Sequence, residues 1–187
     1  MNAIAVPSSP ALLTAEQFCE QYAEYRYELV DGIPVEAPMP GGKHGSIVGL
    51  LVFYLTQFAL ARNLGHVMTC DTFVVTKRGA DTVRGADVLF ASYARIPKDA
   101  VPEGPLTVAP ELVFEVRSPT DRWVSLMAKV TEYLEAGVTA VSVIDPKLET
   151  LTVYRADVDP RTLGKNDTFA LPDVLPGFEM PIAAIFA

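Results

Sequence analysis

Two acidic residues interrupt apolar segments whose composition is otherwise that of buried β-strands. Asp87 lies in the segment 84–90, and Glu115 lies in the segment 112–116. An isolated carboxylate is costly to bury, so an acid in such a segment needs a partner. For Asp87 that partner could be Arg84, a loop backbone amide or a metal ion, and this residue alone does not decide between structural pairing and metal binding.

Strand alternation places Val113, Glu115 and Arg117 on one face of their strand. Glu115 could form a solvent-facing ion pair with Arg117, although the apolar flanks disfavour this. Neighbouring strands lie about 5 Å apart, so Asp87 on an adjacent strand could share a divalent cation with Glu115. Without a cation or a proton the two carboxylates would repel each other. Oxygen ligands suit Mg²⁺ or Mn²⁺, completed by waters and the Val116 carbonyl.

A cationic side chain is expected on the helix that follows. Ser125, Lys129 and Tyr133 are spaced to share one helical face. Lys129 lies at the edge of the apolar stripe, from which its ammonium group can reach the strand ends. The alternative is an ordinary surface lysine paired with Glu132 or Glu135.

Together these residues predict metal-assisted hydrolysis of a phosphodiester. A metal would polarise the phosphoryl oxygen and lower the pKa of a bound water. Arg117 or Lys129 would stabilise the charge that develops on phosphorus. The chain has no Gly-x-Ser-x-Gly motif and no phosphate-binding loop. His44 and His66 have no metal-ligand spacing, but His44 could face the site.

The periodicity of apolar residues and the turn residues predict an α/β fold with a mixed sheet flanked by helices and an added N-terminal β-hairpin. Residues 1–13 are expected to be a flexible segment and residues 14–187 a single domain. Helices are expected at 15–23, 44–63 and 122–136, a hairpin at 27–30 and 33–36, strands at 66–76, 82–91, 111–116, 140–144 and 151–154, a loop at 95–110, and short strands and loops after that.

The composition indicates a cytoplasmic protein. Half of the 187 residues are hydrophobic, but the longest apolar run, 47–55, is broken by Gly49. That run is far shorter than the roughly 20 residues that span a bilayer, and the N-terminus lacks the basic region of a secretory signal. Cys19 and Cys70 have no partners at metal-ligand spacing, so neither a disulfide framework nor a zinc site is expected.

The formal net charge of −8 argues against a protein that coats nucleic acid, because that mode needs a broad basic surface. An enzyme that contacts a few phosphates remains compatible with this charge. We therefore expect a local basic patch on an acidic surface, formed by Lys77, Arg78, Arg84, Arg117, Arg122 and Lys129.

Several motifs match one family pattern in order along nearly the whole chain after residue 14. On these residues the sequence resembles the Uma-two family of restriction-endonuclease-like proteins in the PD-(D/E)xK nuclease superfamily. The most specific part is the Glu-Val-x-Ser-Pro-x-Asp-Arg segment with its downstream Lys and Tyr. The matching segments are 27–32, 43–45, 84–88, 110–122, 129–133, 135–138, 143–146 and 174–178.

The resemblance implies a restriction-endonuclease-like core, Mg²⁺-dependent endonuclease activity on DNA, and often a homodimer. Asp87 and Glu115 match the family's metal-binding acids. Lys129 matches the helix lysine that replaces a strand lysine, and Glu28 and His44 match recurrent positions with an accessory role.

Two positions depart from the family pattern. Ala86 stands where the family usually has proline, which leaves the adjacent carboxylate available. Arg117 stands where the family usually has an aliphatic residue, so it could act as a second cation or could neutralise Glu115 and weaken metal binding. Arg117 and the acidic charge together motivate the alternative hypothesis, a nuclease-like dimeric interaction module with little or no catalytic activity.

Overall fold

The structure is a computed structural model that describes residues 12–22 and 24–187. Most of the segment 1–13, for which we expected flexibility, lies outside these residues. The elements are α1 (Ala15–Tyr22), β1 (Tyr27–Val30), β2 (Ile33–Glu36), α2 (Gly42–Arg62), β3 (Gly65–Lys77), β4 (Thr82–Ser92), β5 (Leu112–Val116), α3 (Trp123–Glu135), β6 (Ala140–Asp145), β7 (Thr150–Arg155), β8 (Val158–Leu163), β9 (Thr168–Phe169), β10 (Met180–Pro181) and the 3₁₀ helix η1 (Ile182–Ile185).

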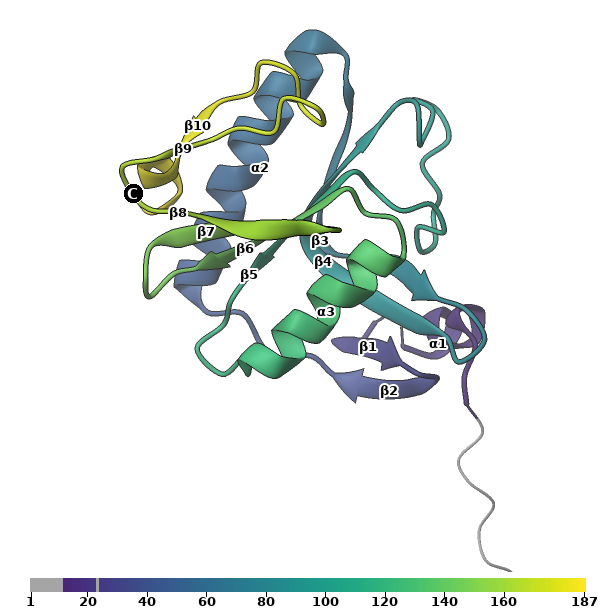
Figure 1. The fold of residues 1–187 in the computed structure, drawn as a ribbon. Coiled ribbons are helices and arrows are strands. Elements are labelled where there is room, and N and C mark those ends of the chain that lie inside the picture. Colours follow the sequence, from purple (N-terminus) through teal and green to yellow (C-terminus); the bar gives the residue numbers. More distant parts are fainter. Residues whose placement is uncertain (1–11, 23) are drawn as a thin grey trace, which may run out of the picture.

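Strands β1 to β8 form one eight-stranded sheet, which is mixed as the sequence predicted, and β9 and β10 form a separate two-stranded sheet (Figure 1). The order of the eight-stranded sheet is β2-β1-β4-β5-β6-β7-β8, and β3 pairs with β4. Only β5 and β6 run parallel among the paired strands of the described chain. A parallel pair needs a crossover connection, and α3 is the helix of that crossover. Glu115 and Lys129 thus lie on consecutive elements at the centre of the sheet.

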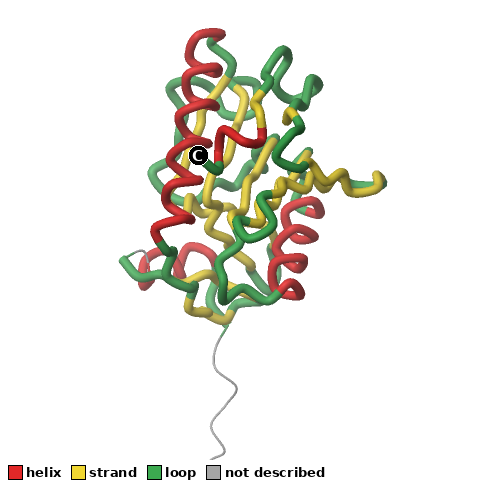
Figure 2. The backbone as a smooth tube through the Cα atoms, turned by 90° about the vertical axis from the view of Figure 1, so that its left-hand side faces the viewer, coloured by secondary structure: helices red, strands yellow, loops and turns green. Residues whose placement is uncertain are grey.

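The two long helices cover opposite faces of the sheet (Figure 2). On one face, Leu51 and Leu55 of α2 pack with Phe114 of β5. On the other face, Leu126 and Val130 of α3 pack with buried residues of β4, β5 and β6. Alternate residues of β5 therefore enter different cores, as strand geometry requires. This alternation directs Glu115 toward α3.

The helix α2 extends well beyond the apolar run 47–55. Gly49 does not break it, and its 21 residues are long and apolar enough to cross a membrane by length and composition alone. The length of the apolar run alone therefore underestimates the length of this apolar helix. In the structure, Ile47, Leu51 and Leu55 form a buried stripe against the sheet.

The N-terminal hairpin extends the sheet beside β4. Asp31 and Gly32 at its turn both have positive φ, 48° and 78°, which suits the two-residue turns that join twisted antiparallel strands. Leu29 of β1 is paired with Val83 of β4 and packs in a small core with Phe18 of α1. The hairpin thereby places Glu28 next to the β4 segment that carries Asp87.

The C-terminal region contains the short strands and loops that were expected, but only part of it lies at the sheet edge. Strand β8 does extend the edge by pairing with β7. In contrast, Phe169, Leu175 and Phe178 are buried in the same core as α2. The Phe58 ring of α2 meets the Phe178 ring at 5.1 Å between centroids. These residues therefore complete the layer around α2, where they cover apolar surface that the helix alone leaves open.

Candidate metal and phosphodiester site

The pairing of β4 with β5 brings the two predicted acids together. The register joins Leu89 to Val113 and Val88 to Phe114. Continued by one residue, this antiparallel register places Asp87 opposite Glu115, where Cβ atoms are about 5 Å apart. The hypothesis of adjacent carboxylates is thus consistent with the geometry.

Asp87 is held by a backbone amide and a histidine. The Val116 N–H donates to Asp87 Oδ2 at 2.7 Å, and His44 Nε2 lies 3.1 Å from the same oxygen. The Thr69 hydroxyl donates to the Asp87 carbonyl at 2.7 Å. Hydrogen bonding to Asp87 raises the pKa of His44 despite the opposing effect of burial. Arg84, the alternative partner considered for Asp87, binds other carboxylates.

Glu115 is almost fully buried, with 4% of its surface exposed. Its Oε1 accepts a hydrogen bond of 3.0 Å from the Tyr133 hydroxyl, and its Oε2 lies 3.7 Å from Lys129 Nζ. Burial is the largest cause that raises the pKa of Glu115 to about 8; Lys129 opposes this rise, and the charges of Asp87 and Glu28 add to it. The site therefore contains more negative charge than its side-chain cations neutralise.

Lys129 lies between two acids that line the cleft and not on the open surface. Its Nζ lies 2.6 Å from Glu28 Oε1 and so is closer to Glu28 than to Glu115. Burial lowers the pKa of Lys129, but the carboxylates of Glu115 and Glu28 outweigh it and the net pKa is raised. The ammonium group is therefore charged and held between two acids.

A buried ion-pair network supports this arrangement from the hairpin side. Arg84 binds Glu28 Oε2 at 2.9 Å and contacts both carboxylate oxygens of Glu132 at 2.5 and 2.8 Å. The Gly85 N–H donates to Glu28 Oε1 at 3.1 Å. The sequence indicated only an accessory role for Glu28, and it suggested Glu132 as a surface partner of Lys129, whereas Glu132 pairs with Arg84. Arg84 in an apolar strand was a signal that a buried acid must face it.

Arg117 lies apart from the two acids, whereas the sequence had left open that it acts as a second cation or neutralises Glu115. Strand β5 ends at Val116, so the alternation that placed Arg117 beside Glu115 does not continue. Arg117 instead binds Asp145 Oδ2 at 2.9 Å, and its guanidinium lies 4.6 Å from the Trp123 ring centroid. Within the described residues it makes no ion pair with Glu115.

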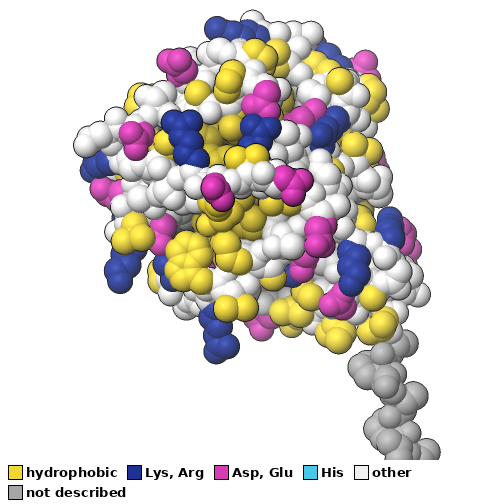
Figure 3. Space-filling view, in the orientation of Figure 1, with side chains coloured by type: hydrophobic (Ala, Val, Ile, Leu, Met, Phe, Trp, Pro, Cys, Tyr) yellow, Lys and Arg dark blue, Asp and Glu magenta, His cyan; other side chains and the backbone are white. Residues whose placement is uncertain are grey.

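The expected basic patch forms only in part: Arg84, Arg122 and Lys129 line one cleft, whereas the other predicted cations pair with acids elsewhere. Lys77 pairs with Asp31 beside the β3–β4 turn, and Arg78 pairs with Glu16 and Asp81 in the same region. Lys and Arg side chains alternate with acidic ones on the face shown in Figure 3, without a continuous basic area. Five of the six predicted cations form salt bridges, namely Lys77, Arg78, Arg84, Arg117 and Lys129.

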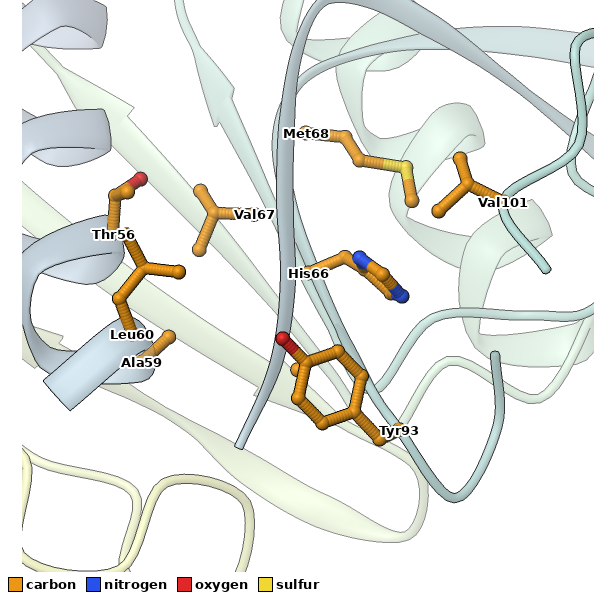
Figure 4. A pocket seen from close by; sticks show the side chains of 9 residues that line it. Thr56, Ala59, Leu60, His66, Val67, Met68, Tyr93 and Val101 are labelled. Carbon is orange, nitrogen blue, oxygen red and sulfur yellow. The ribbon is translucent and has the colours of Figure 1, made fainter. Parts of the chain in front are cut away.

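The acids and Lys129 line a cleft of about 750 Å³ between the hairpin, α2 and α3. A smaller hollow of about 330 Å³ lies beside β3, where His66 and Tyr93 stand near Leu60 of α2 (Figure 4). No acidic side chain lines that hollow. The larger cleft is therefore the candidate site for phosphodiester chemistry.

The donor set fits a hard divalent cation that keeps several waters. Asp87 and Glu115 supply carboxylate oxygens from adjacent strands, and the charged form of Glu115 is costly there mainly because the side chain is buried. In the described chain, no three His, Cys, Asp or Glu side chains converge on one point. Mg²⁺ bound by one or two carboxylates and water matches this set better than a metal enclosed by protein ligands.

The fold and the sequence were compared with known proteins. A crystal structure from Anabaena variabilis ATCC 29413, described as "a putative nuclease belonging to DUF820", superposes with a TM-score of 0.81 at 20% identity and covers 93% of this chain and 97% of that chain. This likeness shows the restriction-endonuclease-like fold. No curated protein matches the chain. Residues 15–183 match the Uma2 family, described as "Putative restriction endonuclease", and the chain therefore belongs to this family.

Proposed function

We propose that this protein is a Mg²⁺- or Mn²⁺-dependent endonuclease that hydrolyses phosphodiester bonds in DNA. The observation that carries the proposal is the opposition of Asp87 and Glu115 on paired strands, with the Lys129 ammonium group beside them. The family and the fold support the same class of reaction.

Each residue of the site has a role in this proposal. Asp87 and Glu115 would hold the metal, which when bound polarises the phosphoryl oxygen and makes a water more acidic. Lys129 would stabilise the negative charge that develops on the phosphoryl oxygens. Its raised pKa keeps it charged, so it acts through its charge and not as a base.

Two neutral or weakly basic groups orient the acids. The Tyr133 hydroxyl donates a hydrogen bond to Glu115 Oε1, which leaves Glu115 Oε2 on the side of Lys129. His44 lies against Asp87 Oδ2, so Oδ1 is the oxygen left for a metal. These contacts fix the carboxylates before a metal arrives, which reduces the cost of organising the site.

A plasmid-cleavage assay with Mg²⁺ or Mn²⁺ tests the proposal. We expect cleavage by the wild type and its loss in Asp87→Ala and in Glu115→Ala. Glu149→Ala is a matched control, because it removes a carboxylate that pairs with Lys165 on the surface. Equal activity in all four proteins, or in none, would contradict the proposal.

The second candidate is a nuclease-like interaction module that forms a homodimer. The observation that favours it is the neutralisation of Arg26, Arg84 and Lys129 by acids within the cleft. Calorimetry at millimolar Mg²⁺ separates the two candidates: binding that depends on Glu115 supports the enzyme, and no binding supports the module. Light scattering after size-exclusion chromatography measures the oligomeric state, and a homodimer is expected for both.

A further inference from the structure

The rim of the cleft is apolar and exposed. Met39, between Pro38 and Pro40 in the segment after β2, is 77% exposed, and Val124 in the first turn of α3 is 82% exposed. Val35 of β2 is 46% exposed and lines the same cleft. Large apolar side chains at such positions have no folding role, and a group of them beside a polar site indicates contact with a ligand.

The interior of the cleft, in contrast, is acidic. Of its cations, Arg26, Arg84 and Lys129 make salt bridges. Among the described residues, Arg122 is the cleft cation that makes none. Six acids line the cleft: Glu28, Glu36, Asp71, Asp87, Glu115 and Asp121.

We propose that the cleft binds a single-stranded segment of DNA, whose unpaired bases contact Met39, Val35 and Val124. This inference rests on the proposed function and names its substrate class. A bound metal would receive the scissile phosphate, while the rim would hold the adjacent bases through apolar contact.

Charge and surface chemistry both favour a single strand over a duplex. A duplex presents its phosphates outward on both strands, and its affinity comes mainly from Lys and Arg side chains that neutralise them. Among the described residues, this cleft offers one cation without a salt bridge and six acids. Single strands instead expose base faces, which bind protein surfaces with little dependence on sequence.

The single tryptophan of the chain, Trp123, is a neighbour in sequence of two cleft residues and provides a fluorescence signal for binding. Trp123 lies between Arg122 and Val124 and is 42% exposed, and Arg117 covers one of its faces. We would titrate nuclease-resistant oligonucleotides of one sequence, single-stranded and duplex, in Mg²⁺ while following Trp123 fluorescence. We expect the single strand to bind at least about tenfold more tightly, the order of one base contact.

Matched variants test the rim itself. Met39→Ser and Val124→Ser should each weaken single-strand binding by roughly threefold to tenfold, the effect of losing part of one base contact. Leu148→Ser and Val158→Ser are the controls, because these side chains are 66% and 61% exposed and lie outside the cleft. The controls should bind like the wild type.

The salt dependence provides a second measurement. Among the described residues, Arg122 is the one cleft cation without a salt bridge. A plot of the logarithm of the association constant for the single strand against the logarithm of salt concentration should therefore have a slope of about −1. Equal or tighter duplex binding, wild-type binding by both rim variants, or a slope steeper than about −4 would overturn the inference. Single-strand binding without cleavage would support this inference and contradict the proposed function, so the two failures are distinguishable.

Discussion

Lys129 Nζ lies 2.6 Å from Glu28 Oε1 and 3.7 Å from Glu115 Oε2. The lysine that would stabilise the transition state is therefore positioned mainly by a residue of the N-terminal hairpin. Arg84 fixes Glu28 from the other side at 2.9 Å. The hairpin is thus part of the site's architecture and not only an extension of the sheet.

Glu28 is a positioning residue whose removal should affect turnover more than substrate binding. In Glu28→Gln, Lys129 loses its closest anionic partner, and Arg84 loses one of its two carboxylate partners. Changes to such supporting groups typically reduce activity by roughly 10–100-fold. We expect kcat to fall by that order while KM changes little, as measured by steady-state cleavage of a fluorescent oligonucleotide.

Asp31→Asn is the control for this experiment. It removes a carboxylate at the turn of the same hairpin, where Asp31 pairs with the exposed Lys77. Exposed ion pairs contribute little to stability, so this variant should keep wild-type kcat. If Glu28→Gln matched the control, the positioning role would be wrong.

The raised pKa of Glu115 predicts that metal binding depends on pH. Its carboxyl pKa moves from 4.5 to about 8, so near neutral pH a metal must displace a proton. Metal affinity should rise from pH 6 to pH 8 and then level off. Calorimetry in two buffers of different ionisation enthalpy would measure the released proton, and no proton release at pH 6.5 would contradict the prediction.

The same shift has a consequence for the stability of the metal-free protein. Between pH 4.5 and about 8 the folded state holds a proton at Glu115 that the unfolded state has lost. Stability from this group is therefore complete below 4.5 and declines as pH rises toward 8. Relative to Glu115→Gln, the wild type in EDTA should lose thermal stability from pH 5 to pH 9. If the Tm values of the wild type and of Glu115→Gln changed equally with pH, the pKa of Glu115 would not be raised in the folded protein.

Arg117 should matter for stability and not for catalysis. Arg117→Ala leaves the buried Asp145 carboxylate without its cation, although the Lys147 and Leu148 amides still donate to it. Loss of one partner of a buried polar pair costs about 1–3 kcal/mol, measurable by urea unfolding. Trp123 fluorescence should also change, since the guanidinium no longer covers its ring.

The kcat of Arg117→Ala distinguishes a purely structural role of Arg117 from the predicted catalytic role. We expect kcat of Arg117→Ala to stay within about threefold of the wild type, whereas removing a transition-state donor typically costs 100-fold or more. Arg155→Ala, which breaks the exposed pair with Asp173, serves as the surface control. A loss of about 100-fold in Arg117→Ala alone would restore the catalytic assignment.

Two glycines should respond in opposite directions to alanine. A Cβ at Gly65 would lie 2.3 Å from the Ala91 carbonyl oxygen, so β3 and β4 would have to separate there. A Cβ at Gly49 of α2 would meet no atom within 4 Å. Gly65→Ala should destabilise the protein by more than about 2 kcal/mol, and Gly49→Ala should stabilise it by about 0.5–1 kcal/mol. Thermal melts compare the two, and similar Tm values would contradict the prediction.

The sequence alone predicted the elements up to β7 and singled out the two acids, but it did not specify β8 or η1. The helical spacing of apolar residues from His44 and the strand alternation around Glu115 are local patterns. Each pattern indicates its element because the apolar side chains must face a core. Asp87 stood out for the same reason, since an acid in an apolar strand is costly unless partnered. The structure has these elements within about two residues of the predicted bounds.

Only the tertiary structure decided which charges meet. Arg117 and Lys129 were both plausible cations, but β5 ends before Arg117 and the crossover helix carries Lys129 back over Glu115. Glu28 reaches Lys129 from a hairpin 101 residues earlier in the chain, a contact that no local pattern encodes. Two charges interact according to their distance in space. That distance depends on strand order and helix placement, and the spacing of side chains along one strand does not specify either.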